Sequence, residues 1–255
     1  IEDTNRATPE DVRKFYQTYY TPSNAVIVLV GDFEPAKARD RIKHYFEGIP
    51  ARPKAPETDL KEPERTQEKR ESAPEAGIPA PVTIISWRVP PVTDADWFPL
   101  MCVGEVLGGN TAARLQNSLI KTAAIATVAQ VGLENSAGPN LFVFQLMIAP
   151  GKDAAQAETL AYEEVDRIGR EGVGEDEIQR VRTDSLRRHA FGLVPGNLRA
   201  QEFALSLISD GRLDSVNEWE KKVRSVTSED LQRVTRRYLT PARRTVFLNT
   251  PGGKP

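Results

Sequence analysis

The chain has 255 residues, of which 39% are hydrophobic and 27% charged, as is typical of globular proteins. Its 34 basic and 36 acidic residues are interspersed and give a net charge of −2, so it lacks the basic patch of a nucleic-acid-binding protein. No apolar run reaches the ~20 residues that span a membrane, and a single cysteine, Cys102, excludes an intrachain disulfide. These totals leave both the cytoplasm and the periplasm open as the compartment.

The N-terminal region predicts a helix, a strand and a second helix. Thr8 is a good N-cap and a proline follows it, so residues 8–20 are expected to be helical. The apolar run 25–30 predicts a buried strand, and helical spacing of apolar residues over 36–46 predicts another helix. Residues 50–63 hold four prolines, many charges and almost no large apolar side chain, which indicates an extended linker between domains.

After the linker, strands and helices mix without a regular alternation, which predicts an α+β fold built as a two-layer sandwich. Two of the strands are separated by the polar turn 134–140, so an antiparallel pair is expected there. The predicted strands are 64–72, 82–89, 125–133, 141–148 and 245–248. The predicted helices are 94–107, 111–121, 153–170, 174–193, 198–209, 215–223 and 227–238.

One segment near the N-terminus is repeated near the C-terminus. Thr-Pro-Glu-Asp at residue 8 opens a helix that ends in Tyr-Tyr-Thr-Pro and leads into an apolar strand, and the same order recurs 219 residues later. Helix capping explains the Thr, Glu and Asp, but not a Tyr-x-Thr-Pro at the same distance. We name residues 8–30 the first copy and 227–249 the second copy. The matching pairs are Thr8/Thr227, Glu10/Glu229, Asp11/Asp230, Tyr19/Tyr238, Thr21/Thr240, Pro22/Pro241 and Leu29/Leu248.

Internal similarity at so long a period indicates a duplicated domain of about 219 residues. We therefore expect residues 1–49 to be the C-terminal remnant of a preceding homologous domain, 50–63 to be a linker, and 64–255 to be a complete domain. About 187 residues of the first domain would then lie upstream, with Ile1 as a cut end. The incomplete first copy would expose apolar surface, which predicts a homodimer of the fragment.

Residues with catalytic or metal-binding chemistry are scarce. The two histidines, His44 and His189, are 145 residues apart and have no cysteine at ligand spacing. The chain has no His-Glu-x-x-His or His-x-x-Glu-His pair and no Gly-x-Ser-x-Gly elbow. Gly-Gly-Asn-Thr at 108–111 could bind an anion before a helix, but a helix end followed by a new N-cap explains it more simply. No catalytic residue and no metal ligand is predicted within this chain.

Three stretches, taken in order, carry a resemblance. They are Thr-Pro-Glu-Asp-Val through Ala-Val-Ile-Val-Leu-Val-Gly-Asp (8–32), Val-Leu-Gly-Gly through Ala-Arg-Leu and Ile-Ala-Thr (106–127), and Val-Thr-Ser-Glu-Asp-Leu through Arg-Thr-Val (226–246). Together the chain resembles the M16 family of zinc metallopeptidases, which includes pitrilysin, insulin-degrading enzyme, mitochondrial processing peptidase and bacterial relatives. The resemblance covers essentially the whole chain. It implies a mixed, largely antiparallel sheet with helices packed on one face.

The resemblance also says which family residues are missing. The family's zinc site, an inverted His-x-x-Glu-His with a distant Glu, belongs to the domain before this one, and none of it is present. A later family domain carries an Arg and a Tyr, seven residues apart, that help to hold substrate. The matching positions here are Ile120 and Thr127, so that pair is absent and no substrate-binding residue is assigned. The chain thus resembles the inactive, C-terminal domain of the zinc-bearing half.

The resulting hypothesis is a non-catalytic fragment of a zinc-dependent endopeptidase, which forms scaffold and chamber wall for peptide substrates. The chain itself would hold no cofactor and be inactive, whereas the parent protein would hold zinc. A second M16 half, in cis or as a partner subunit, would complete the chamber. Two alternatives stay open: an inactive assembly subunit like the core proteins of the respiratory bc1 complex, and a peptide-binding module that uses an exposed sheet edge.

Overall fold

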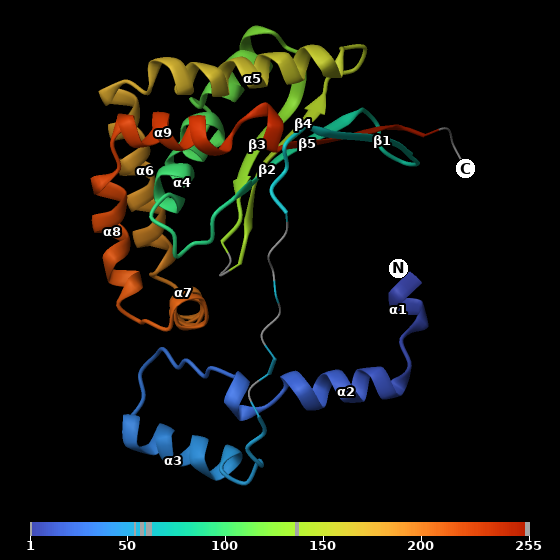
Figure 1. The fold of residues 1–255 in the computed structure, drawn as a ribbon. Coiled ribbons are helices and arrows are strands. Elements are labelled where there is room, and N and C mark those ends of the chain that lie inside the picture. Colours follow the sequence, from blue (N-terminus) through green and yellow to red (C-terminus); the bar gives the residue numbers. More distant parts are fainter. Residues whose placement is uncertain (1, 54, 57–58, 60–62, 136–137, 253–255) are drawn as a thin grey trace. The chain divides into compact units, whose positions relative to one another are not determined.

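A computed structural model describes residues 2–53, 55–56, 59, 63–135 and 138–252 (Figure 1). The chain divides into two compact units: unit 1 comprises residues 1–59 and 191–216, and unit 2 comprises 60–190 and 217–255. The described residues of the predicted linker, 50–63, form no helix or strand. The domain boundaries expected from the repeat stay a prediction.

Unit 2 contains a five-stranded sheet in the order β1-β5-β2-β4-β3. β1 and β5 pair in parallel and the other neighbours pair antiparallel, so the predicted mixed, largely antiparallel sheet is confirmed. The strands are β1 (Lys69–Glu75), β2 (Val82–Val89), β3 (Ala126–Leu133), β4 (Asn140–Ile148) and β5 (Arg244–Pro251). The last strand along the chain, β5, thus lies between β1 and β2, the first two strands of the unit.

Helices of unit 2 pack against this sheet, and Figure 1 shows α4, α5 and α9 gathered on one side of it. Burial alternates strictly along β2, as expected when one face of a sheet is covered. The helices of unit 2 are α4 (Trp97–Gly108), the π-helix η2 (Gln116–Thr122), α5 (Ala154–Glu171), α6 (Glu175–Gly192, its last two residues in unit 1), α8 (Ser215–Ser225, its first two residues in unit 1), α9 (Ser228–Tyr238) and the short η3 (Pro241–Arg243). The two-layer sandwich predicted from the sequence is confirmed.

The core of unit 2 lies between the sheet and α4, α5 and α9. Trp87 is its largest fully buried side chain and meets Phe142 and Phe144 of β4 edge-on, at 6.3 and 5.1 Å between ring centroids. Its indole nitrogen donates to the carbonyl of Thr240 at 3.2 Å, so its one polar atom is satisfied. The tryptophan therefore joins β2 to the turn between α9 and β5.

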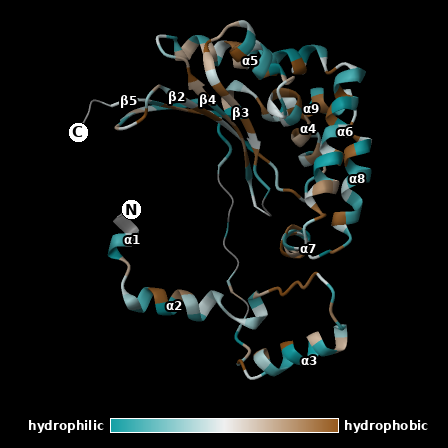
Figure 2. Cartoon of the chain, turned by 180° about the vertical axis from the view of Figure 1, so that it is seen from behind, coloured by the Kyte–Doolittle hydropathy of each residue, from teal (hydrophilic) through white to brown (hydrophobic). Residues whose placement is uncertain are grey.

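Unit 1 contains helices but very few buried residues. Its helices are α1 (Glu2–Arg6), α2 (Pro9–Tyr19), η1 (Pro22–Asn24), α3 (Pro35–Phe46) and α7 (Gly196–Asp210). None of the apolar side chains of residues 4–53 is buried. Figure 2 shows the stretch between η1 and α3 as strongly hydrophobic, although Ile27 and Leu29 are 49% and 50% exposed.

Two predicted elements differ from the structure. The segment 25–30 is extended but is not a strand, because a strand needs a hydrogen-bonded neighbour and no described residue supplies one. The predicted helix 111–121 begins as a turn and becomes the π-helix η2, with the positive-φ residue Ala124 (φ 47°) just after it. The spacing of apolar residues alone predicts neither the missing neighbour of 25–30 nor the π-helix.

Candidate functional site: the open face of the sheet

The two faces of β2 have different surroundings. Thr83, Ile85, Trp87 and Val89 are buried, whereas the residues between them are half-exposed. The half-exposed set points to the side of the sheet opposite the core. This second side of β2 is therefore partly open to solvent.

The register of the neighbouring strands extends this surface. Ile84 lies between Gln145 of β4 and Phe247 of β5, and Ser86 lies between Val143 and Thr245. Directly opposite residues of an antiparallel pair project from the same face. We name the resulting surface the open face; it consists of Val82, Ile84, Ser86, Arg88, Leu141, Val143, Gln145, Met147, Thr245, Phe247 and Asn249, none of which is buried. It combines an apolar centre with hydroxyl and amide groups.

One end of the open face is hollowed. A cavity of about 590 Å³ is lined by Ser86, Arg88 and Leu141 of the sheet and by Tyr238 and Arg243, among others. Two of its arginines are held in place: Arg88 donates to the carbonyl of Pro63 at 3.2 Å, and Arg243 donates to Glu64 at 3.2 Å. The hollow is large enough for one or two side chains of a bound polypeptide.

A buried carboxylate fastens the helix layer beside this hollow. Asp96, whose side chain is 7% exposed, accepts hydrogen bonds from Arg233 at 2.5 Å, Arg237 at 3.0 Å and the Tyr238 hydroxyl at 2.9 Å. Burial alone would raise the pKa of Asp96, but the bonds from Arg233 and Tyr238 and the two positive charges outweigh it and lower that pKa. Burial and the Asp96 charge raise the pKa of Tyr238 to about 12, so the hydroxyl stays a donor.

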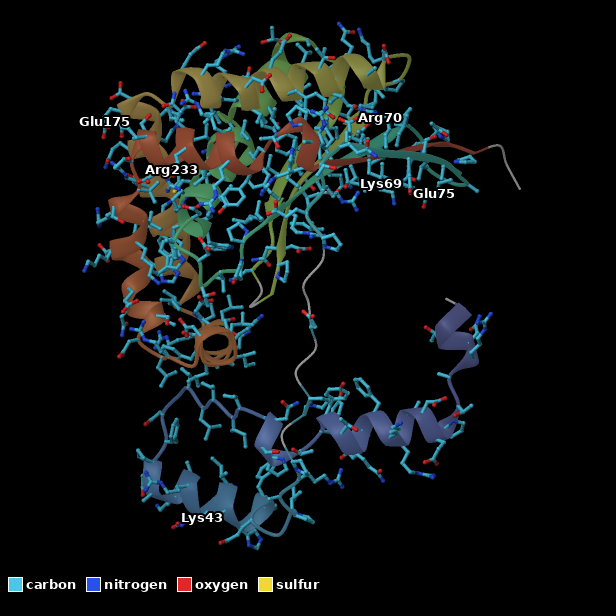
Figure 3. All side chains as sticks on the ribbon, in the orientation of Figure 1. Lys43, Lys69, Arg70, Glu75, Glu175 and Arg233 are labelled. Carbon is cyan, nitrogen blue, oxygen red and sulfur yellow. The ribbon has the colours of Figure 1, made fainter. Side chains whose placement is uncertain are left out.

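A second charged group holds the β1 edge of the sheet. Figure 3 labels Arg70 on β1, and its guanidinium binds both carboxylate oxygens of Glu158 on α5, at 2.8 and 3.3 Å. Arg244 of β5 binds Glu68 and lies over the ring of Tyr162, 3.7 Å from the ring centroid. Planar guanidinium groups suit such bidentate and stacked contacts. The parallel pair β1–β5 is thereby tied to α5.

Among the residues that the structure describes, the groups that could hold a metal are not assembled. His189 stacks on Trp219 at 4.1 Å between ring centroids, and His44, in unit 1, meets the ring of Tyr45. Over the described ranges, no cluster of three or more His, Cys, Asp or Glu side chains could bind a metal ion. Burial raises the pKa of the Cys102 thiol to about 12, so this cysteine is a core residue and no nucleophile. The donors present therefore do not fit the zinc site that the family resemblance implies for a parent protein.

The two positions singled out by the resemblance lie in irregular backbone. Ile120, in the π-helix, packs partly buried against the core, whereas Thr127 is exposed on the edge strand β3 at a register shift. The Thr127 hydroxyl donates to the Met147 carbonyl at 3.4 Å. Neither side chain carries a charge. The absence of the substrate-holding pair stays a prediction.

The glycine pair before η2 has a packing role. A Cβ on Gly108 would lie 2.5 Å from Cγ2 of Val131 on β3, which is closer than real side chains approach. Asn110 caps the next turn, since its Oδ1 accepts from the Ala112 amide at 2.8 Å. The close approach of α4 to β3 thus accounts for a motif that could have been read as an anion site.

Sequence reasoning missed the open face and the Asp96 group. The face could have been recognised from the strict alternation in Val-Thr-Ile-Ile-Ser-Trp-Arg-Val, where an exposed set includes Ile84. The Arg-x-x-x-Arg-Tyr spacing on α9 puts three donors on one helix, but its acceptor lies 137 residues away from the first of them. Only tertiary structure joins the two.

The fold and the open face define a sheet-and-helix domain with one partly exposed sheet face and, among its described residues, no cluster that could bind a metal ion. A family model for the peptidase M16 inactive domain matches residues 6–184. Because that match covers more than half of the sequence, the chain belongs to the M16 peptidase family and carries its inactive domain.

Similar proteins agree with this assignment. The zinc protease PqqE of Helicobacter pylori is 24% identical over 97% of this chain, which spans 56% of that protein. A protease from Helicobacter pylori of known crystal structure has a TM-score of 0.92 at 21% identity, over 98% of this chain and 61% of that one. A chain of Complex III2 from Candida albicans has a TM-score of 0.81 at 13% identity, over 97% of this chain and 60% of that one. This chain therefore spans little more than half the length of these relatives.

Proposed function

We propose that this chain is the non-catalytic part of a zinc-dependent endopeptidase and that its open face forms a wall for peptide substrates. The observation that carries the proposal is an uncovered sheet face with an apolar centre, Ile84, Val143 and Phe247, in a member of the M16 inactive-domain family. The similarity to a zinc protease supports the reaction class. The zinc would be bound outside the residues described here, so no catalytic step is assigned to this chain.

The chemistry of the open face suits unfolded or extended peptides. Half-exposed apolar side chains shed water when a peptide covers them, and Ser86, Gln145 and Thr245 can exchange hydrogen bonds with its backbone. Such a surface contacts many sequences weakly and selects few of them. It fits a wall that retains a substrate while another domain cleaves it.

Pairing with a second half belongs to the same proposal. Members of the family combine two halves within one chain or as separate subunits. A wall becomes a chamber only when a second surface faces it, so we expect the second half to approach the open face. Among the described residues, no helix is long and apolar enough to cross a membrane.

The test places a photocrosslinking amino acid on the open face and on a control helix. Gln145 is exposed on β4, and Asp166 is exposed on the outer side of α5. With a reduced, unfolded polypeptide as probe, we expect crosslinking at 145 to exceed that at 166 by about tenfold, as a preferred surface contact worth about 1.4 kcal/mol would give. Equal yields at both positions would refute the wall.

The second candidate is a catalytically inactive assembly subunit. It is favoured by the fold shared with the Complex III2 chain over nearly the whole of this sequence. The zinc content of the native protein, isolated from its source cells, separates the two. About one zinc per molecule supports the peptidase, whereas a protein free of zinc and of peptidase activity supports the assembly subunit.

A further inference from the structure

The hollow of the open face carries an excess of positive charge. Among the described residues that line it are three arginines and two glutamates, Arg65, Arg88, Arg243, Glu64 and Glu134. Both carboxylates are already engaged: Glu64 accepts a hydrogen bond from Arg243 at 3.2 Å, and Glu134 accepts one from a backbone amide near the start of β4 at 3.0 Å. A hollow with more cations than anions in its lining concentrates a positive field, so it favours an anionic group.

The ion pair at the rim of the hollow is easily exchanged. The Glu64 side chain is 81% exposed, whereas that of Arg243 is 30% exposed. An exposed pair of this kind contributes little to stability, because water competes for both charges. Arg243 has a second support, since its guanidinium lies over the ring of Tyr238, 5.8 Å from the ring centroid. A carboxylate that enters the hollow can therefore replace Glu64 while Arg243 keeps its place.

Two hydroxyl groups lie in the lining of the same hollow. Ser86 of β2 and Thr245 of β5 are directly opposite each other in the antiparallel register. Their Cβ atoms are therefore about 4.5–5.5 Å apart on one face of the sheet. Arg88 follows Ser86 by two residues and projects from the same face. A hydroxyl both donates and accepts, so this end of the face offers acceptors for an N–H group beside donors for a carboxylate.

A peptide C-terminus has the matching set of groups. Its carboxylate, ionised at pH 7, suits the paired donors of a guanidinium. The N–H of the last residue belongs to the same residue as that carboxylate, so a hydroxyl beside the arginines can accept from it. An internal Glu or Asp holds its carboxylate at the end of a flexible side chain, which costs entropy to order. The volume of about 590 Å³ also leaves room for the side chain of the last residue.

We propose that the hollow binds the C-terminal carboxylate of a peptide that lies on the open face. Arg88 and Arg243 hold the carboxylate, and Ser86 and Thr245 accept from the N–H of the last residue. Glu64 takes the place of the carboxylate against Arg243 when no peptide is bound. This site rests on the proposed function, since it names the end of the peptide that the wall retains.

The first experiment compares two peptides on the unaltered chain. One is an unstructured, uncharged peptide with a neutral fluorophore on its N-terminus and a free carboxyl group, and the other is the same peptide with a C-terminal amide. Fluorescence anisotropy at pH 7 gives the two dissociation constants. We expect the free acid to bind about tenfold more tightly, because the amide loses the charge-assisted hydrogen bonds to the arginines.

A third peptide, amidated but with a glutamate in its middle, distinguishes a terminal carboxylate from a side-chain carboxylate. We expect it to bind like the amide. Equal affinities of the free acid and the amide would overturn the proposal. Full restoration of affinity by the internal glutamate would also overturn it, since the hollow would then accept a carboxylate from any part of a peptide.

Glu64→Gln should give a result that a merely structural residue would not. The change removes the carboxylate that competes for Arg243, so the free acid should bind about threefold more tightly and the amide as before. A Glu64→Gln variant that binds the free acid no more tightly than the parent would show that Glu64 does not occupy the place of the ligand.

Arg88→Gln and Arg187→Gln form a matched pair, since each removes one positive charge from unit 2. Arg187 is 60% exposed on α6, away from the residues of the hollow. Arg88→Gln should bring the ratio of the two affinities close to one, whereas Arg187→Gln should leave it at about tenfold. Arg88→Lys should restore part of the ratio, because it keeps the charge and loses the planar pair of donors. A ratio that survives Arg88→Gln would overturn the assignment of this arginine.

Unfolding followed by tryptophan fluorescence shows whether each variant is folded. Should Arg88→Gln fail to fold, Arg243→Gln makes the same test from the other side of the hollow. The titrations also separate this site from the wall. If the free acid and the amide bind equally well, the wall stands and the hollow is no carboxylate site. If neither peptide binds, the wall and the carboxylate site are both wrong.

Discussion

The same helical sequence pattern occurs twice in this protein, once with its apolar side chains buried and once with them exposed. In both copies a threonine N-cap accepts a hydrogen bond from the amide of the aspartate three residues on, at 3.2 Å. Both helices have eleven residues. Yet α9 buries Leu231, Val234 and Tyr238 in a core, while α2 buries nothing. Local sequence is thus sufficient for the helix and insufficient for its burial, which depends on a sheet that, in the described part of the chain, is present only around the second copy.

The difference can be tested most strongly in the strands. Val246→Asp places a charge in the middle of the sheet, and we expect it to cost about 4 kcal/mol or more and to unfold unit 2. Ile27→Asp, the matched change in the first copy, should alter the unfolding free energy by less than about 0.5 kcal/mol. Denaturation followed by tryptophan fluorescence reads unit 2 alone, since Trp87, Trp97 and Trp219 all lie there. Equal effects would mean that the first copy is packed in the free chain.

Substitutions in the two helices should also change the unfolding free energy more in the second copy than in the first, by a smaller difference than in the strands. Leu231→Ala leaves a cavity in a closed core and should cost about 2–5 kcal/mol. Val12→Ala removes an exposed side chain and should change the unfolding free energy by less than about 0.5 kcal/mol. The two midpoints in urea, compared at an unchanged slope, provide the measurement. A costly Val12→Ala would contradict the comparison.

The Asp96 group adds a pH dependence to the second copy alone. Because the pKa of Asp96 is lowered on folding, its contribution is fully present above the unfolded-state value of about 3.9 and is lost as pH falls through the folded-state value. The stability difference between the parent and Asp96→Asn should therefore be constant above about pH 5 and shrink below about pH 4.

The tyrosines test the same group without a change of charge. Tyr238→Phe removes the hydroxyl that donates to Asp96 at 2.9 Å and should cost about 1 kcal/mol. Tyr19→Phe is the control and should cost nothing measurable in the free chain. Urea titrations at pH 7 compare them. A loss at Tyr19 as large as that at Tyr238 would show that the first copy already has its acceptor.

The caps should give the smallest effect. Thr227→Ala removes one bond of a capping box and should lower the stability of unit 2 by about 1 kcal/mol. Thr8→Ala breaks the same box on an exposed helix, so it should reduce helicity by circular dichroism and leave the tryptophan transition unchanged. If Thr8→Ala shifts that transition, α2 is coupled to unit 2.

Most of the architecture follows from patterns within single elements. The sequence predicted β2, β4, α5, α6 and α9 close to their observed places, and the irregular mixture of strands and helices predicted a two-layer sandwich. The segment 25–30 was wrongly predicted as a strand because apolar composition reports a preference for burial and not the presence of a neighbour. The π-helix η2 was missed since its spacing of apolar residues does not differ visibly from that of an α-helix over seven residues.

The candidate site was less accessible to prediction, because it is made by register and long-range pairing. Ile84 and Phe247 become neighbours only when β5 inserts beside β2, and nothing in either strand specifies that partner. The acceptor of Arg233, Arg237 and Tyr238 lies at the start of a helix far away in the chain. The sequence by itself determined most of the elements and their caps, since these depend on residues a few positions apart, and it also displayed the repeat. Tertiary structure alone decided which copy is buried and which face of the sheet is open, because burial depends on the surfaces that meet.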